Sequence, residues 1–95
     1  MCGIYFSNYL FSESKIKKKL DQIANRGPDF QGILIKDPNC FGHNRLAIID
    51  LDKRSNQPMQ FDQYTIVFNG EIYNYLEVKK ELETSGVTFD TTSDT

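Results

Sequence analysis

Cys2 directly follows the initiator Met1 and is the residue of this chain best suited to nucleophilic chemistry. If Met1 is removed, one residue carries both a thiol and the free α-amine of the chain. Thiols and α-amines titrate close together, so an α-amine can accept a thiol proton near neutral pH. The pair predicts a nucleophile that needs no separate histidine base. By itself, a cysteine is more often an inert buried side chain.

Three further segments hold polar residues that could support such a nucleophile. They are Asn25–Asp29, His43–Leu46 and Asn69–Asn74. Judged singly, each has a structural explanation: an Asn-Gly pair is typical of a hairpin turn, a Gly-Pro pair of a loop and a lone arginine of the surface. Cys40 and His43 have zinc-ligand character, but no second pair of ligands follows them, so the sequence predicts no metal site.

Composition excludes several classes of protein. The chain has 95 residues and a net charge of −2, which predicts one small domain at most and argues against a nucleic-acid surface. No apolar run approaches the roughly 20 residues that span a bilayer, and the N-terminus lacks the pattern of a secretion signal. Two cysteines without framework spacing predict a reducing compartment, the cytoplasm.

The first half of the chain predicts a strand, a helix and a hairpin. Residues 2–7 are mostly apolar, as in a buried strand. A helix is expected at about 13–25, because Ser12 suits an N-cap with Phe11 and Ile16 placed as a hydrophobic staple. Strands at 32–36 and 40–42 are expected to flank a proline turn at 37–39.

The second half predicts two strands and a helix. Residues 46–51 form an apolar, β-branched run typical of a strand, and a polar loop is expected over 52–63. A strand follows at 64–68, then a helix from about 72 that Gly86 ends. A further strand is expected to begin at 87–89. The order predicts an α+β fold with the first strand central in its sheet.

Taken together, the motifs resemble one family. The chain is similar to the start of class II glutamine amidotransferases, which are N-terminal-nucleophile glutaminases, and within them to the glutamine-hydrolysing asparagine synthetases. The resemblance extends over the whole chain. Its motifs are Met1–Ile4, Arg26–Asp29 with Gly32, His43–Leu51, Gln57–Met59, Asn69–Asn74 and Thr92–Asp94. One departure is Asn25, where the family often has a histidine.

This resemblance implies an N-terminal-nucleophile αββα sandwich, of which residues 1–95 are about the first half. The polar end of the chain is interpreted as a C-terminal truncation. The implied partners are glutamine and either the absent synthetase domain or a complementing chain, with no nucleic acid and no membrane. The full-length protein is expected to form a homodimer. No cofactor is expected in this fragment, whereas ATP and magnesium belong to the synthetase domain.

The resemblance also assigns site residues. Cys2 would be the nucleophile, and the Asn69 side-chain amide and the Gly70 backbone N–H would stabilise the oxyanion. Arg45 would bind the glutamine carboxylate and Asp94 the ammonium, with Glu71 assisting and backbone groups of Ile48 and Ile49 completing the pocket. Arg26 and Asp29 are interpreted as supports for the loop beside Cys2, and His43 as structural.

The implied function is the glutaminase half of a glutamine-dependent asparagine synthase. It would hydrolyse glutamine to glutamate and ammonia for the ATP-dependent amidation of aspartate. Two alternatives stay open at this point. The ammonia acceptor could be a sugar or a secondary metabolite, or the chain could be a non-catalytic remnant that acts as a binding module.

Overall fold

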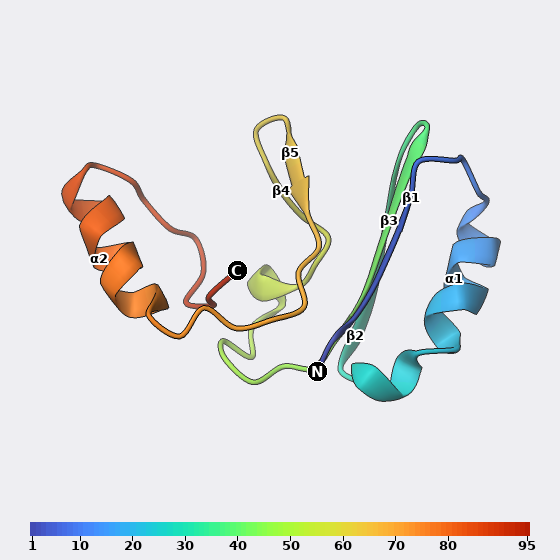
Figure 1. The fold of residues 1–95 in the computed structure, drawn as a ribbon, viewed down its shortest axis with the longest axis horizontal. Helices are drawn as coiled ribbons and strands as arrows, with labels where there is room; N and C mark the ends of the chain where they lie inside the picture. The colour runs from blue at the N-terminus through green and yellow to red at the C-terminus, as the bar shows by residue number, and fades with distance from the viewer.

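A three-stranded antiparallel sheet, a separate β-hairpin and two α-helices make up the computed structural model, which describes residues 1–95 (Figure 1). This arrangement fits the predicted α+β class. In chain order the elements are β1 (Gly3–Ser7), α1 (Glu13–Asp21), η1 (Ala24–Arg26), β2 (Phe30–Lys36), β3 (Asn39–Arg45), η2 (Lys53–Ser55), β4 (Met59–Phe61), β5 (Tyr64–Ile66) and α2 (Tyr75–Thr84).

The sheet has the order β1-β3-β2, so β3 is central and β1 lies at an edge. The prediction of a central first strand is therefore wrong. The reason is that β2 and β3 pair as a hairpin, with Phe30 opposite Arg45 at one end and Lys36 opposite Asn39 at the other. This pairing leaves the other edge of β3 for β1. There β1 pairs with β3, with Gly3 opposite Asn44 and Ser7 opposite Cys40. Both hairpin strands are also longer than predicted.

Helix α1 begins as predicted but ends four residues early. The Ser12 hydroxyl caps it by accepting from the Lys15 backbone N–H at 3.4 Å. At its other end the Leu20 carbonyl accepts from the Ile23 N–H at 3.0 Å and from the Asn44 side-chain amide at 2.7 Å. These bonds replace the α-helical bond from residue 24, so the chain continues as the 3₁₀ turn η1.

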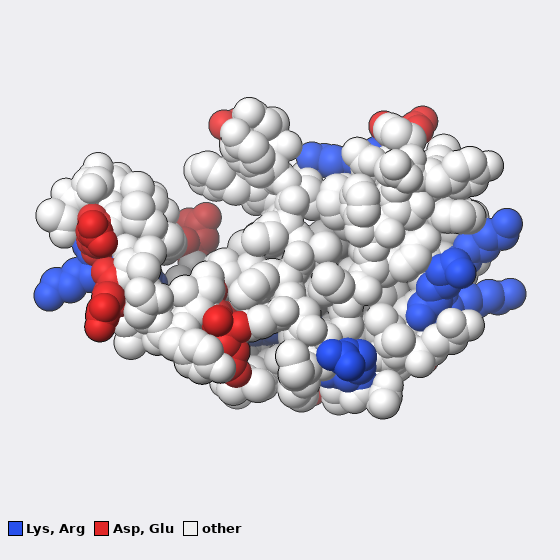
Figure 2. All heavy atoms as spheres, viewed as in Figure 1, with Lys and Arg blue, Asp and Glu red and all other residues white.

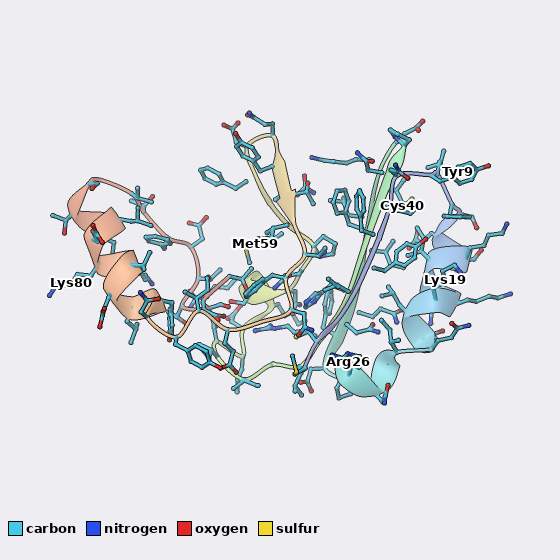
Figure 3. The ribbon with its side chains drawn as sticks, in the orientation of Figure 1. Tyr9, Lys19, Arg26, Cys40, Met59 and Lys80 are labelled. Atoms are coloured by element: carbon cyan, nitrogen blue, oxygen red, sulfur yellow. The ribbon has the colours of Figure 1, made fainter.

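The apolar core lies between α1 and one face of the sheet. Ile16, Leu20 and Cys40 have no exposed surface, and Tyr5, Phe11, Ile23 and Ile33 pack around them. The Cys40 thiol also donates to the Tyr9 carbonyl at 3.6 Å (Figure 3). Burial of an Ile or Leu side chain contributes about 1.5–3 kcal/mol. The packing of α1 against the sheet is therefore the main apolar stabilisation of the fold.

The predicted strand at 46–51 is wrong. These residues form a loop in which side chains, not a neighbouring strand, bind the backbone groups. The Leu46 N–H donates to Cys2 Sγ at 3.3 Å and the Ala47 N–H to Asp29 Oδ2 at 2.7 Å. Asp50 has a φ of 50°, which is incompatible with an extended strand.

The predicted loop at 52–63 is wrong in part, because it contains η2 and β4. Strand β4 pairs with β5, with Met59 opposite Ile66 and Phe61 opposite Tyr64. Strand β5 is shorter than the predicted strand at 64–68. Helix α2 starts at Tyr75, three residues later than predicted, and ends before Gly86, whose φ of 94° suits glycine. Residues 87–89 form no strand.

Helices α1 and α2 lie at opposite ends of the 43 Å long axis of the molecule (Figure 1). Lysines gather on α1 at one end, whereas α2 at the other end carries both glutamates and lysines (Figure 2). No residue of α2 is buried, and the helix stands apart from the sheet (Figure 1). Neither helix has the length and apolar character that crossing a membrane would require.

Candidate functional site

One cavity of about 310 Å³ opens where the N-terminus, the end of β3 and three later segments meet. This volume lies at the small end of the range for small-molecule sites. The structure brings all the predicted site residues to its wall, although they come from distant parts of the chain. They are Cys2, Arg45, Ile48, Ile49, Asn69, Gly70, Glu71 and Asp94. Their chemical roles remain predictions.

Cys2 is half-buried at the start of β1, with contacts to two later segments. Its Sγ accepts a hydrogen bond from the Leu46 N–H at 3.3 Å, and its carbonyl accepts one from Arg26 Nε at 3.2 Å. Met1 lines the same cavity. Removal of Met1 would therefore place a free α-amine at the cavity wall, beside the thiol.

The loop Arg26–Asp29 lies directly against the end of β3. A Cβ at Gly27 would collide with the backbone of Asn44 and Arg45, so only glycine permits this close approach. The Asp29 N–H donates to the Arg45 carbonyl at 2.9 Å, and its carboxylate accepts from the Ala47 N–H. These contacts agree with the prediction that Arg26 and Asp29 shape the loop beside Cys2.

Arg45 is nearly buried and organises the loop after β3. Its Nη1 donates to the Asp52 carbonyl at 2.9 Å and to Asn56 Oδ1 at 2.8 Å. Its Nη2 donates to the carbonyls of Ile49 and Asp50. These bonds leave Nε–H as the one guanidinium N–H without a partner in the chain. Arg45 thus adds a positive charge to the cavity wall and shapes the loop that carries Ile48 and Ile49.

The Asn69-Gly70 pair is not a hairpin turn, because it lies in an irregular segment between β5 and α2. The preceding residue, Phe68, is bound on both sides of its backbone. Its N–H donates to Gln57 Oε1 at 2.6 Å, and its carbonyl lies 3.1 Å from His43 Nε2. The sequence placed Gln57 in a motif of the family but did not predict this contact.

His43 is fully buried on β3 and agrees with its predicted structural role. Burial lowers the pKa of the imidazole, with a smaller lowering from the Arg45 charge, while the bond to the Phe68 carbonyl opposes both. Because a carbonyl only accepts hydrogen bonds, the neutral ring must carry its proton on Nε2. Nδ1 then holds a lone pair and has no partner in the chain.

Asp94 lies on the C-terminal segment that forms one side of the cavity. Its Oδ2 accepts from the Ile72 N–H at 2.9 Å, next to Glu71. Two carboxylates and one guanidinium therefore line the same cavity. This distribution of charge complements a zwitterion, since an ammonium favours carboxylates and a carboxylate favours arginine.

Asp50 connects the loop after β3 to the same C-terminal segment and was not among the predicted site residues. Its carboxylate accepts from the Thr92 N–H at 2.8 Å and from the Ser55 hydroxyl at 2.9 Å. It also accepts from Arg54 Nε and the Asp52 N–H. The Thr92 bond, assisted by the others, holds the pKa of Asp50 well below its usual range. In the sequence, Asp50 stands out only as part of the motif His43–Leu51.

A model of the glutamine amidotransferase domain family matches residues 1–95, and the chain belongs to this family. The resemblance inferred from the motifs is thereby confirmed. The chain is similar to glutamine-hydrolyzing asparagine synthetase 1 of Bacillus subtilis (strain 168), with 46% identity over 85 residues, which cover 87% of this chain and 13% of that protein.

Two further relatives carry similar names. Glutamine-hydrolyzing asparagine synthetase 3 of Bacillus subtilis (strain 168) is 38% identical over 104 residues, covering 100% of this chain and 17% of the relative. Glutamine-hydrolyzing asparagine synthetase 1 of Saccharomyces cerevisiae is 34% identical over 86 residues, covering 85% and 15%. The chain thus spans less than a fifth of each of these three proteins. No solved structure matches it.

Proposed function

We propose that this chain is the glutaminase part of a glutamine-dependent asparagine synthase, with Cys2 as its nucleophile. The observation that carries the proposal is the convergence of all eight predicted residues on one small cavity. The family supports the glutaminase activity. The names of the relatives favour aspartate, rather than a sugar or a secondary metabolite, as the acceptor of the ammonia.

The proposed reaction begins with removal of Met1. The Cys2 α-amine takes the thiol proton, and Sγ adds to the side-chain amide carbon of glutamine. The Asn69 side-chain amide and the Gly70 N–H stabilise the oxyanion. Collapse of this intermediate releases ammonia, which takes the proton from the amine, and leaves a γ-glutamyl thioester. Water then hydrolyses the thioester, giving glutamate and the free thiol.

Substrate selection would use the charges at the cavity wall. Arg45 faces the glutamine carboxylate through Nε–H, with the backbone N–H groups of Ile48 and Ile49 beside it. Asp94 and Glu71 face the ammonium. A site that must match both charges would exclude a glutamine residue within a peptide chain, because the α-amino and α-carboxyl groups of that residue are no longer charged.

The remaining steps would belong to other parts of the protein. We propose that residues 1–95 are the first part of an N-terminal-nucleophile αββα sandwich, and that a synthetase domain or complementing chain uses the ammonia. The ATP and magnesium chemistry would take place in the synthetase domain. Two free thiols suit the cytoplasm.

Glutamate release from glutamine tests the proposal, together with intact mass to establish removal of Met1. Cys2→Ala should abolish release, and Asn69→Ala should lower kcat by about 10²–10³-fold, as loss of one oxyanion donor does. Cys40→Ala is the matched control, since that thiol lies in the core away from the cavity, and it should retain activity. Activity that survives in Cys2→Ala, or a wild-type chain that is processed but inactive, contradicts the proposal.

A further inference from the structure

We propose that His43 and Gln57 are positioning residues that together hold the Asn69-Gly70 segment at the cavity. We call the two side chains and the Phe68 peptide groups they bind the Phe68 clamp. The inference rests on the proposed function, because it assigns a role to these residues in stabilising the oxyanion. Neither residue is proposed to touch the substrate.

The two contacts bind Phe68 from opposite sides. Gln57 Oε1 accepts from the Phe68 N–H at 2.6 Å, and His43 Nε2–H donates to the Phe68 carbonyl at 3.1 Å. The carbonyl of Phe68 belongs to the peptide group whose nitrogen is that of Asn69. Fixing it therefore fixes the direction in which the chain enters the Asn69-Gly70 pair.

Both side chains are held firmly by their surroundings. His43 is fully buried on the central strand β3, and Gln57 is 6% exposed. Gln57 also donates from Nε2 to Thr95 Oγ1 at 3.2 Å, so its amide is used at both ends. The hydrogen bonds at both ends of the Gln57 amide and the full burial of the His43 ring leave the two side chains few alternative positions, which makes them rigid supports.

The Phe68 ring extends the clamp to Gly70. Its Cζ atom lies 3.0 Å from the position that a Cβ on residue 70 would occupy. The ring thus occupies the space beside Gly70, while the backbone of Phe68 is bound by the two side chains. Residues 67–74 belong to no helix or strand, so no regular ladder fixes their backbone. The clamp supplies that constraint at the residue just before the predicted oxyanion donors.

Substitution of Gln57 separates positioning from general stability. Gln57→Leu removes the acceptor for the Phe68 N–H, whereas Gln57→Glu keeps it, and Gln60→Leu is the matched control at an exposed glutamine three residues away. We expect Gln57→Leu to lower kcat for glutamine hydrolysis by about 10²-fold, the cost of misplacing a catalytic group by about 1 Å. KM should change little, Gln57→Glu should recover part of kcat, and Gln60→Leu should match wild type.

Alkylation of Cys2 by iodoacetamide supplies the second measurement. This displacement forms no oxyanion, so its rate should be the same in Gln57→Leu as in wild type. The same pattern is expected for His43→Leu, with partial recovery in His43→Gln, which retains a side-chain N–H donor. Equal loss of alkylation and hydrolysis would overturn the proposal by showing general disruption, and so would a kcat of Gln57→Leu equal to that of Gln60→Leu.

Amide hydrogen exchange at Phe68, Asn69 and Gly70 keeps the clamp testable if the proposed function fails. A wild-type chain that hydrolyses no glutamine would refute the function alone. Faster exchange at these amides in Gln57→Leu and His43→Leu, but not in Gln60→Leu, would still show that the clamp positions the segment. Unchanged exchange in both variants would overturn the clamp, whatever the activity.

Discussion

Residues 1–45 and residues 46–95 are stabilised by different interactions. The first region packs α1 against a sheet over a core of Ile16, Leu20 and Cys40, whereas the second contributes no fully buried apolar side chain. The radius of gyration of 14.2 Å exceeds the ~12 Å expected for a well-packed chain of this length, because α2 and the β4–β5 hairpin stand away from the sheet.

The second region is organised by side-chain to backbone hydrogen bonds. Asp50, Gln57 and Asp94 each accept from a backbone N–H in another segment, and Arg45 reaches across from β3 to four oxygens of the loop. The cavity lies at the junction of the two regions. The comparison indicates that Cys2 is positioned by a packed scaffold. The residues predicted to bind the oxyanion and the ammonium are instead positioned by a polar network.

Leu20→Ala should have the largest effect on stability. Leu20 of α1 is fully buried against Gly42 of β3, so its truncation should cost about 2–5 kcal/mol of unfolding free energy. Urea denaturation followed by circular dichroism measures this change. A loss below about 1 kcal/mol would mean that the core does not dominate the stability of the first region.

Asp50→Asn should break the polar network and leave the core in place. Four hydrogen bonds to the carboxylate weaken when its charge is removed. We expect the Thr92 amide to exchange about tenfold faster with solvent, since hydrogen bonds to charged groups are the stronger ones. Exchange at Cys40 in the sheet should be unchanged. Equal acceleration at both sites would contradict the division into two regions.

The pH dependence gives the Asp50 prediction a sign. Its pKa is lowered in the folded chain, so the ionised form contributes stability above the unfolded pKa of about 3.9. That contribution disappears as pH falls through the folded pKa. The stability difference between wild type and Asp50→Asn should therefore be constant near pH 7 and shrink below about pH 4. A difference that grows on acidification would show that the carboxylate is not stabilised by these bonds.

Ser12→Ala should have a smaller effect, within the first region. The substitution removes the N-cap of α1, which typically costs about 1 kcal/mol. Thermal unfolding detects this loss, and Ser12→Asp should restore most of it because aspartate also caps helices. A neutral Ser12→Ala would indicate that packing of Ile16 and Leu20 alone defines the helix start.

Leu76→Ala on α2 should have the smallest effect of the series. This leucine is 66% exposed, so its truncation should change the unfolding free energy by less than about 0.5 kcal/mol. The comparison with Leu20→Ala keeps the chemical change constant and varies only burial. A loss comparable to that of Leu20→Ala would show that α2 buries apolar surface in solution and would break the contrast between the regions.

The sequence predicted best where local chemistry decides the structure. The Ser12 cap and the proline hairpin turn depend on neighbouring residues, and both are present. The end of α1 was missed because it depends on Asn44, which is distant in sequence and takes the Leu20 carbonyl. The apolar run at 46–51 was mistaken for a strand because its backbone groups bond to the side chains of Cys2, Asp29 and Arg45 and not to a neighbouring strand.

The candidate site was predicted residue by residue through resemblance, and the cavity brings those residues together. Their supports were not predicted. Gln57 and Asp50 act on backbone groups 11 and 42 residues away, and such contacts leave no periodic pattern in the sequence. Composition and spacing identify groups that can react, whereas the side chains that orient them become visible only in the fold.

Glutamine-protected labelling of Cys2 tests the central claim, that the junction of the two regions forms a glutaminase pocket. Intact mass should show loss of Met1 and then one adduct from a diazo-ketone analogue of glutamine. Excess glutamine should block this adduct, and peptide mapping should place it on Cys2, with the buried Cys40 unlabelled as the internal control. Retained Met1, or labelling that glutamine does not prevent, would contradict the account.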